Sequence, residues 1–120
     1  MDVRSQLVVK VTAGAEAPER CAQGFTVASV AAASGVTVSL WLTGEAVWLA
    51  VPGHEVELAH SPALTTLRDA VLAGGTVTVC SQCAARRDLT EADLVPGVRL
   101  AGAAVFVSEA MADGAQALVY

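Results

Sequence analysis

The sequence predicts an α/β fold, in which helices cover both faces of a mostly parallel, five-stranded sheet. Short apolar runs without polar alternation recur along the 120 residues, as expected of strands buried on both faces. Segments with helical spacing of apolar residues separate these runs. Right-handed crossovers between such strands build an open three-layer α/β/α sheet. No internal repeat or linker divides the chain, so we expect a single domain over residues 1–120.

The first half of the chain predicts two strands, a long helix and a short helical segment. Pro18 and Glu19 suit the first turn of the long helix, and Gly35 suits its C-terminal end. Gly44 and Glu45 form the turn that follows the second strand. The predicted elements are a strand over 5–12, a helix over 14–35, a strand over 36–43 and a short helical segment over 45–51.

The second half begins with a polar loop over 52–60 and continues with the clearest helix of the chain. Ser61 is suited to cap this helix, and Pro62 suits its first position. Ser81 and Thr90 are suited to cap two shorter helical segments further on. The predicted elements are a helix over 61–75, a strand over 76–80, helical segments over 81–88 and 89–94, a strand within 96–102, a helix over 102–114 and a strand over 115–120.

Composition and charge narrow the classes of function. Hydrophobic residues make up 54% and charged residues 16%, which excludes disorder and suggests a subunit interface. The net charge of −5 argues against nucleic acid as a partner, because phosphates bind to a basic face. Residues 1–4 lack the layout of a signal peptide, and the apolar stretch over 36–51 is too short to span a bilayer. We therefore expect a cytoplasmic protein without a membrane span, whose cysteines stay reduced.

The end of the third strand is the strongest candidate for a site, since open parallel sheets bind ligands beyond the carboxyl ends of their strands. Cys80 ends this strand, and Cys83 falls in the first turn of the next helix. The partial positive charge and free N–H groups of a helix N-terminus favour the nucleophilic thiolate, and Arg86 and Arg87 add positive potential. We predict Cys80 as a nucleophile and Cys83 as a resolving thiol. Cys21 lies on an apolar helix face and is predicted to be core.

The segment Cys-Ser-Gln-Cys-Ala-Ala-Arg-Arg over 80–87 resembles the strand-Cys-x-x-x-Ala-x-Arg-Arg motif of the DsrE/DsrF-like (DsrE/TusD-type) sulfur-relay family. The first strand with its long helix and the second strand with its small-residue turn also resemble this family. The resemblance implies a three-layer fold with a five-stranded parallel sheet and oligomers, often trimers or hexamers. Two positions depart from the sulfur-carrier motif: Cys83, which gives the C-x-x-C of a subgroup, and Asp88, which replaces a glycine.

In sulfur-carrying members of the family, the cysteine that matches Cys80 accepts sulfane sulfur as a persulfide and passes it to the next carrier. The resemblance therefore implies a sulfurtransferase or sulfur carrier, with sulfur donor and acceptor proteins as partners. We expect a homo-oligomer and no bound cofactor.

Three alternatives remain open. Cys80 and Cys83 could form a dithiol–disulfide redox site, because C-x-x-C after a strand resembles the thioredoxin arrangement. The same two thiols could bind tetrahedral zinc together with His54 and His60. A third alternative is a non-catalytic subunit that binds a small ligand in the cleft at the strand ends.

Several residues around the strand ends are expected to support the site. Glu45 could face Cys80 across the cleft, where a carboxylate would raise the pKa of the thiol. Trp41 is predicted to be core, and Trp48 is predicted to be core or to line an oligomer interface. The full supporting set is Gly44, Glu45, Ser81, Gln82, Arg86 and Arg87.

Overall fold

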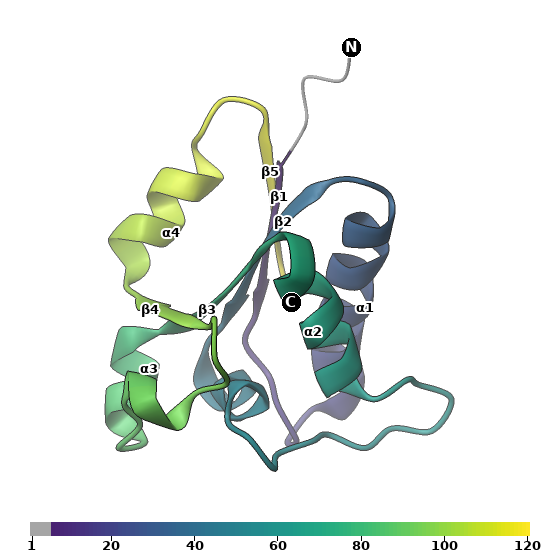
Figure 1. The fold of residues 1–120 in the computed structure, drawn as a ribbon, viewed down its shortest axis with the longest axis vertical. Coiled ribbons are helices and arrows are strands. Elements are labelled where there is room, and N and C mark those ends of the chain that lie inside the picture. The colour runs from purple at the N-terminus through teal and green to yellow at the C-terminus, as the bar shows by residue number, and fades with distance from the viewer. Residues whose placement is uncertain (1–5) are drawn as a thin grey trace.

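The computed structural model describes residues 6–120 and confirms the predicted α/β architecture (Figure 1). All five strands run parallel in one sheet, in the order β4-β3-β2-β1-β5. Ser5, the predicted start of the first strand, lies outside the described residues. So do residues 1–4, which lack the layout of a signal peptide. The strands are β1 (Gln6–Val11), β2 (Thr37–Leu42), β3 (Thr76–Cys80), β4 (Arg99–Ala101) and β5 (Ala115–Val119).

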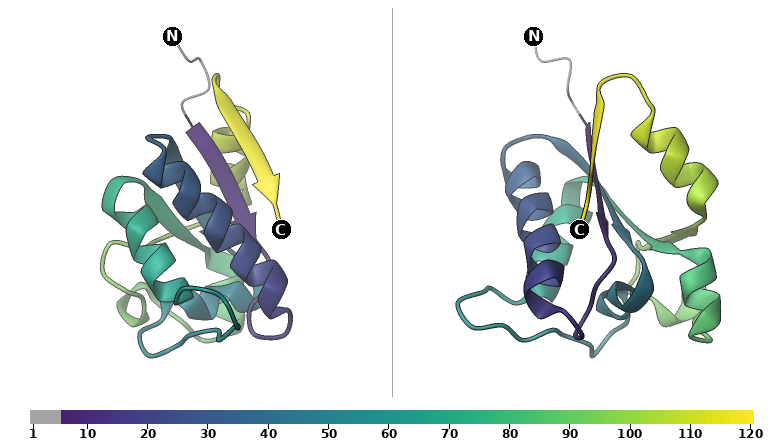
Figure 2. Two further views of the ribbon diagram at one scale, coloured as in Figure 1. Left: turned by 90° about the vertical axis from the view of Figure 1, so that its right-hand side faces the viewer. Right: turned by 180° about the vertical axis from the view of Figure 1, so that it is seen from behind.

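Helices cover both faces of the sheet. Figure 1 views the sheet nearly edge-on, with α1 and α2 on one side and α3 and α4 on the other, and Figure 2 shows the same layers from two further directions. Among the described residues, no helix combines the length and the apolar character needed to cross a membrane. The helical elements are α1 (Pro18–Ala33), the 3-10 helix η1 (Gly44–Ala50), α2 (Leu64–Gly74), α3 (Ser81–Arg86), the 3-10 turn η2 (Glu91–Asp93) and α4 (Ala103–Ala110).

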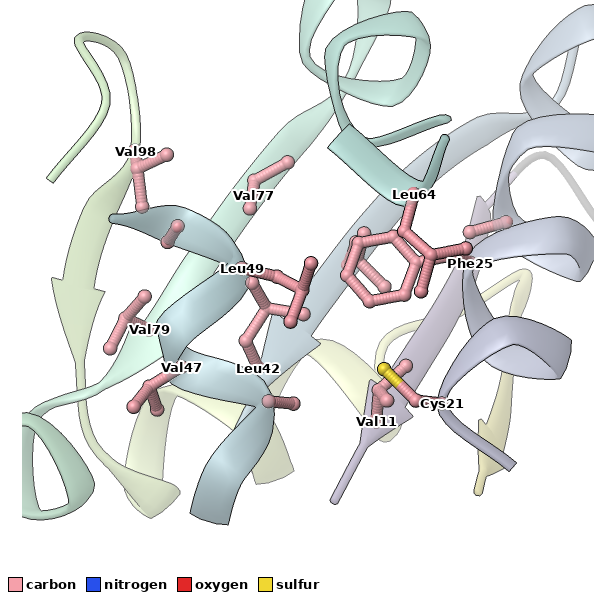
Figure 3. Close-up of a cluster of buried hydrophobic side chains, with 14 of the residues drawn as sticks. Val11, Cys21, Phe25, Leu42, Val47, Leu49, Leu64, Val77, Val79 and Val98 are labelled. Atoms are coloured by element: carbon pink, nitrogen blue, oxygen red, sulfur yellow. The ribbon is translucent and has the colours of Figure 1, made fainter. Parts of the chain in front are cut away.

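The main core lies between the sheet and the layer formed by α1, α2 and η1. Alternate valine and leucine side chains of β1, β2 and β3 point into it. Phe25 of α1, Leu64 of α2 and Leu49 of η1 fill the space above them (Figure 3). Cys21 of α1 belongs to the same cluster and is 0% exposed, which confirms that it is a core residue.

The opposite face of the sheet, beneath α4, carries buried polar side chains and partly buried charged ones. Glu109 of α4 accepts hydrogen bonds at Oε1 from Ser39 Oγ (2.6 Å) and Trp41 Nε1 (2.9 Å), and Arg99 pairs with its Oε2. Trp41 is buried, as predicted, and meets Phe106 edge-on with ring centroids 5.4 Å apart. The strand register places one row of side chains across this face, formed by Lys10, Trp41, Thr78 and Arg99.

The N-terminal boundaries of two helices differ from the prediction. α1 begins at Pro18 rather than residue 14, because Gly14 packs against the backbone after β2: a Cβ there would lie 2.5 Å from the carbonyl oxygen of Glu45. The predicted Ser61 cap is wrong, since its hydroxyl donates to the Pro62 carbonyl and α2 begins only at Leu64.

The Glu55 carboxylate takes the place of that cap. Its Oε1 accepts from the backbone N–H of Leu64 (3.0 Å), and its Oε2 accepts from the N–H (3.2 Å) and hydroxyl (2.7 Å) of Thr65. Partial burial raises the pKa of Glu55, but the bonds from Thr65, Val56 and Leu64 outweigh it, so the pKa lies below its usual value. A charged acceptor from the polar loop thus satisfies the free donors at the start of α2.

Candidate functional site

Cys80 lies at the carboxyl end of β3, at the position where the sequence predicts a site. Its backbone pairs with Ala101 of β4, and the residue itself is the N-cap of α3. Ser81 is therefore the first helical residue rather than the predicted cap, because the non-helical backbone of Cys80 (φ −60°, ψ 122°) already makes the turn. Cys80 is a free thiol and is partly exposed, so a small reactant can reach it.

Several groups around Cys80 favour its thiolate. Partial burial raises the pKa of this thiol, but interactions with the backbone N–H and thiol of Cys83, the N–H of Gln82 and the charge of Lys10 outweigh it. The pKa of Cys80 therefore lies below its usual value. None of the N–H groups makes a close capping hydrogen bond to the sulfur, so their effect is that of nearby dipoles at a helix start.

Lys10 was not among the residues selected from the sequence. It lies on β1, two strands away from β3, but the register puts it on the same sheet face as Thr78, two residues before Cys80. Its Nζ lies 4.9 Å from the centroid of the Phe106 ring, which holds the ammonium group beneath α4. The available signal was a single lysine inside an apolar strand.

Cys83 is held on the inner side of α3. It is 9% exposed, and its Sγ accepts a hydrogen bond from the backbone N–H of Gly44 (3.3 Å), with Arg86 Nη1 at 4.0 Å. Gly44 has φ +54°, and a Cβ there would lie 2.7 Å from the carbonyl oxygen of Thr12. A glycine is therefore needed at this turn. The ends of β1, β2 and β3 meet here, as the parallel sheet predicts.

Glu45 and Arg87 form a pair instead of acting directly on Cys80. Arg87 Nε donates to Glu45 Oε2 (2.8 Å), and Arg87 Nη1 donates to the Cys83 carbonyl oxygen (3.0 Å). The structure thus corrects the expectation that Glu45 faces Cys80 and opposes its ionisation. Arg87 links the start of η1 to α3, whereas Arg86 remains beside the Cys83 sulfur.

The remaining supporting residues lie along the rim of the site. Gln82 is exposed on the first turn of α3. Ser81 lies close to the start of α4, since a Cβ on Gly102 would lie 3.6 Å from its Oγ. Trp48 is half-buried on η1 and stacks on His54 with ring centroids 5.0 Å apart. Thr90 caps η2 as predicted, in a reciprocal arrangement with Asp93.

The four side chains of the alternative zinc site do not come together. His54 is engaged by Trp48, and His60 lines a separate cavity between α1 and the loop before α2. Within residues 6–120, no three histidine, cysteine or acidic side chains are grouped so that they could hold a metal ion. In the part of the chain that the structure describes, the thiols of Cys80 and Cys83 therefore lie apart from both histidines.

Comparison with solved structures identifies the fold. The YchN protein from E. coli superposes with a TM-score of 0.78 at 18% identity, covering 96% of this chain and 99% of that one. MTH1491 from Methanobacterium thermoautotrophicum, a protein of unknown function, gives a TM-score of 0.72 at 12% identity, covering 96% and 98%. BT1422 from Bacteroides thetaiotaomicron, also of unknown function, gives 0.65 at 16%, covering 100% and 98%.

A comparison with curated proteins gave no match. In contrast, the sequence pattern of the DsrE/DsrF-like family matches residues 6–120, which include every element of the fold and both thiols of the site. The chain therefore belongs to the DsrE/DsrF-like family.

Proposed function

We propose that this protein accepts sulfane sulfur on Cys80 as a persulfide and passes it to an acceptor protein. The observation that carries the proposal is a partly exposed thiol of lowered pKa, at the functional edge of the sheet in a DsrE/DsrF-like chain. A thiolate is the form that attacks sulfur, and a site that stabilises a thiolate also stabilises an anionic persulfide.

The transfer step is a thiol exchange. The Cys80 thiolate attacks the outer sulfur of a donor persulfide, the donor's S–S bond breaks, and the donor leaves as a thiol that keeps the persulfide proton. Cys80 then carries one additional sulfur as an anionic persulfide. Attack by an acceptor thiolate on that outer sulfur reverses the exchange and regenerates Cys80.

Intact mass spectrometry after incubation with a small alkyl persulfide tests this proposal. The Cys83→Ser variant is used so that only one thiol of the pair is present. We expect a gain of one sulfur atom, sensitive to reductant, and its loss in the Cys80→Ser/Cys83→Ser double variant. Equal uptake by the double variant would refute the role of Cys80.

A homo-oligomer, trimeric or hexameric, is the assembly that we propose for this activity. The support is a set of exposed apolar side chains on α4, directly after it and on the edge strand β5, namely Val105, Val107, Met111, Leu118 and Val119. Met111 is the most exposed of these side chains, at 78%.

Sedimentation of the Val107→Lys/Met111→Lys variant tests the assembly. We expect the wild-type chain to sediment as an oligomer and the variant to dissociate, because two charges would be buried in the interface. Val30→Lys is the matched control, since Val30 is 59% exposed but lies on α1. A monomeric wild type at micromolar concentration would contradict the proposal.

A further inference from the structure

We infer that Cys83 resolves the Cys80 persulfide and releases the carried sulfur as sulfide, leaving a Cys80–Cys83 disulfide. The inference rests on the proposed function, because Cys80 must first be loaded with sulfur. The site then has a second reaction besides passing sulfane sulfur to an acceptor. The protein reduces this sulfur to sulfide, and its own two thiols are oxidised to a disulfide.

The positions of the two cysteines on α3 permit the disulfide. Cys80 is the N-cap and Cys83 lies in the first helical turn, three residues on. The side chain of an N-cap residue reaches toward the third residue of the helix, which is the position of Cys83. A disulfide needs about 3.5–4.5 Å between Cβ atoms, and residues so placed can reach this distance by a small adjustment at the helix start. The side chain of Cys83 is also one of the groups that lower the pKa of Cys80.

The unequal exposure of the two thiols assigns them different roles. Cys80 is partly exposed, whereas Cys83 is buried behind α3 and receives the N–H of Gly44 at its sulfur. A donor molecule therefore reaches Cys80 and not Cys83. The reaction within reach of Cys83 is attack on the sulfur of Cys80, its neighbour in the same turn.

The contacts of Cys83 hold its sulfur in place for this attack. The Gly44 N–H (3.3 Å) and Arg86 Nη1 (4.0 Å) approach the sulfur from η1 and from α3 itself. Arg87 Nη1 also binds the Cys83 carbonyl oxygen and so fixes the backbone of the turn. Gly44 and Arg87 thus position Cys83 without touching the reacting persulfide.

The chemical step balances without a further reactant. The Cys83 sulfur attacks Sγ of the Cys80 persulfide, the bond between Sγ and the outer sulfur breaks, and the Sγ–Sγ bond of the disulfide forms. The outer sulfur leaves as hydrosulfide (HS⁻), which takes the proton lost by Cys83. The two thiols of the reduced protein are oxidised by two electrons, and the sulfane sulfur is reduced by the same two. Each chain releases one sulfide, and a dithiol reductant is needed only before a second turnover.

A single-turnover experiment under anaerobic conditions tests the inference. The reduced protein is mixed with a small alkyl persulfide, excess donor is removed within seconds by desalting, and sulfide and intact mass are followed over time. We expect wild type to release about one sulfide per chain while it loses two hydrogens, with both changes at the same rate. Cys83→Ser should keep its sulfur and release sulfide at least about tenfold more slowly. Cys21→Ala, which removes the buried third thiol, should behave as wild type.

The outcomes separate this inference from the proposed function. If wild type and Cys83→Ser both take up sulfur and both retain it, the inference is overturned and the carrier role stands. If Cys83→Ser is folded but takes up no sulfur, the carrier role itself fails.

If Cys83→Ser does not fold, the wild-type protein alone still tests the inference. Peptide mapping should find the Cys80–Cys83 disulfide appearing in step with sulfide. A persistent persulfide without this disulfide would overturn the inference.

Discussion

The two faces of the sheet bury their side chains in different ways. Under α1, α2 and η1 the buried cluster is apolar. The guanidinium group of Arg68 lies at its margin, where it forms an ion pair with Asp69 and donates a hydrogen bond to the Leu49 carbonyl oxygen. Under α4, a carboxylate, a guanidinium and an ammonium group lie among aromatic rings. The first face supplies stability through buried apolar area, whereas the second places charge near the reactive sulfur.

The cysteines show what this difference does to one residue type. Burial, together with the smaller effect of the charges of Glu16 and Glu55, raises the pKa of Cys21 to about 12. The pKa of Cys80 is instead lowered, because nearby N–H groups and Lys10 outweigh its burial. A thiol in the apolar core is inert, and a thiol at the sheet edge is prepared for reaction.

Alkylation of the native protein should show the largest difference. Near neutral pH, we expect iodoacetamide to label Cys80 at least about a thousandfold faster than Cys21, because only the thiolate reacts and Cys21 is also inaccessible. Peptide mapping by mass spectrometry measures both rates. Denaturant serves as the control and should make the rates similar. Similar labelling rates for Cys80 and Cys21 in the native protein would contradict this difference between the core and the site.

Truncation of one aromatic ring on each face compares their contributions to stability. Phe25→Ala should lower the free energy of unfolding by about 3–5 kcal/mol, since it opens a cavity among fully buried side chains. Phe106→Ala on α4 should cost less than half as much, because that ring is only half-buried. Urea unfolding measures both values. Equal losses would show that the second face contributes as much apolar stabilisation as the first.

The partly buried carboxylate of Glu109 under α4 should make the free energy of unfolding depend on pH. Burial raises the pKa of Glu109, but the bonds from Ser39, Trp41 and Arg99 outweigh it, so the folded pKa lies below the ordinary value of 4.5. Ionised Glu109 therefore stabilises the fold above that ordinary value, and this contribution is lost as pH falls through the folded pKa. Glu109→Gln should flatten the acid limb of the stability profile.

At neutral pH, Glu109→Gln should also cost about 1–3 kcal/mol, because Arg99 loses its charged partner. Urea unfolding at a series of pH values measures both effects. Glu57→Gln, at an exposed carboxylate of the loop before α2, is the matched control and should change neither quantity appreciably. An unchanged acid limb in Glu109→Gln would show that this carboxylate contributes nothing to the polar face.

Replacement of Lys10 should give the smallest effect. Lys10→Met removes a positive charge that lowers the pKa of Cys80, so this pKa should rise and alkylation near neutral pH should slow by a few-fold. The rate of alkylation as a function of pH measures the change. Lys10→Arg keeps the charge and should stay close to wild type. If Lys10→Met alkylates at the wild-type rate throughout, the charge beneath α4 does not act on the site.

The sequence was sufficient for the fold and for the placement of Cys80 and Cys83 where β3 meets α3, because apolar strands and helix starts are local signals. Cys80 and Cys83 were found because they follow a recognisable strand. The ion pair between Glu45 and Arg87 was not predicted, because its partners are far apart in the sequence and meet only when the strand ends align. The Ser61 cap was wrong because capping is a competition, and the Glu55 carboxylate from the preceding loop supplies the acceptor. Lys10 was not predicted, because it lies two strands away from Cys80 and its charge lowers the pKa of that thiol only in the folded sheet.

The pairing of β5 with β1 sets an order of events during translation. β1 leaves the ribosome early, but the edge that faces away from β2 finds its partner only after residue 119 has been synthesised. Until then Gln6–Val11 offers a row of unpaired backbone groups, beside a sheet whose other strands can already associate. A chain that stalls before β5 would therefore carry an open template for pairing with a neighbouring chain, and aggregation during synthesis should be its characteristic failure.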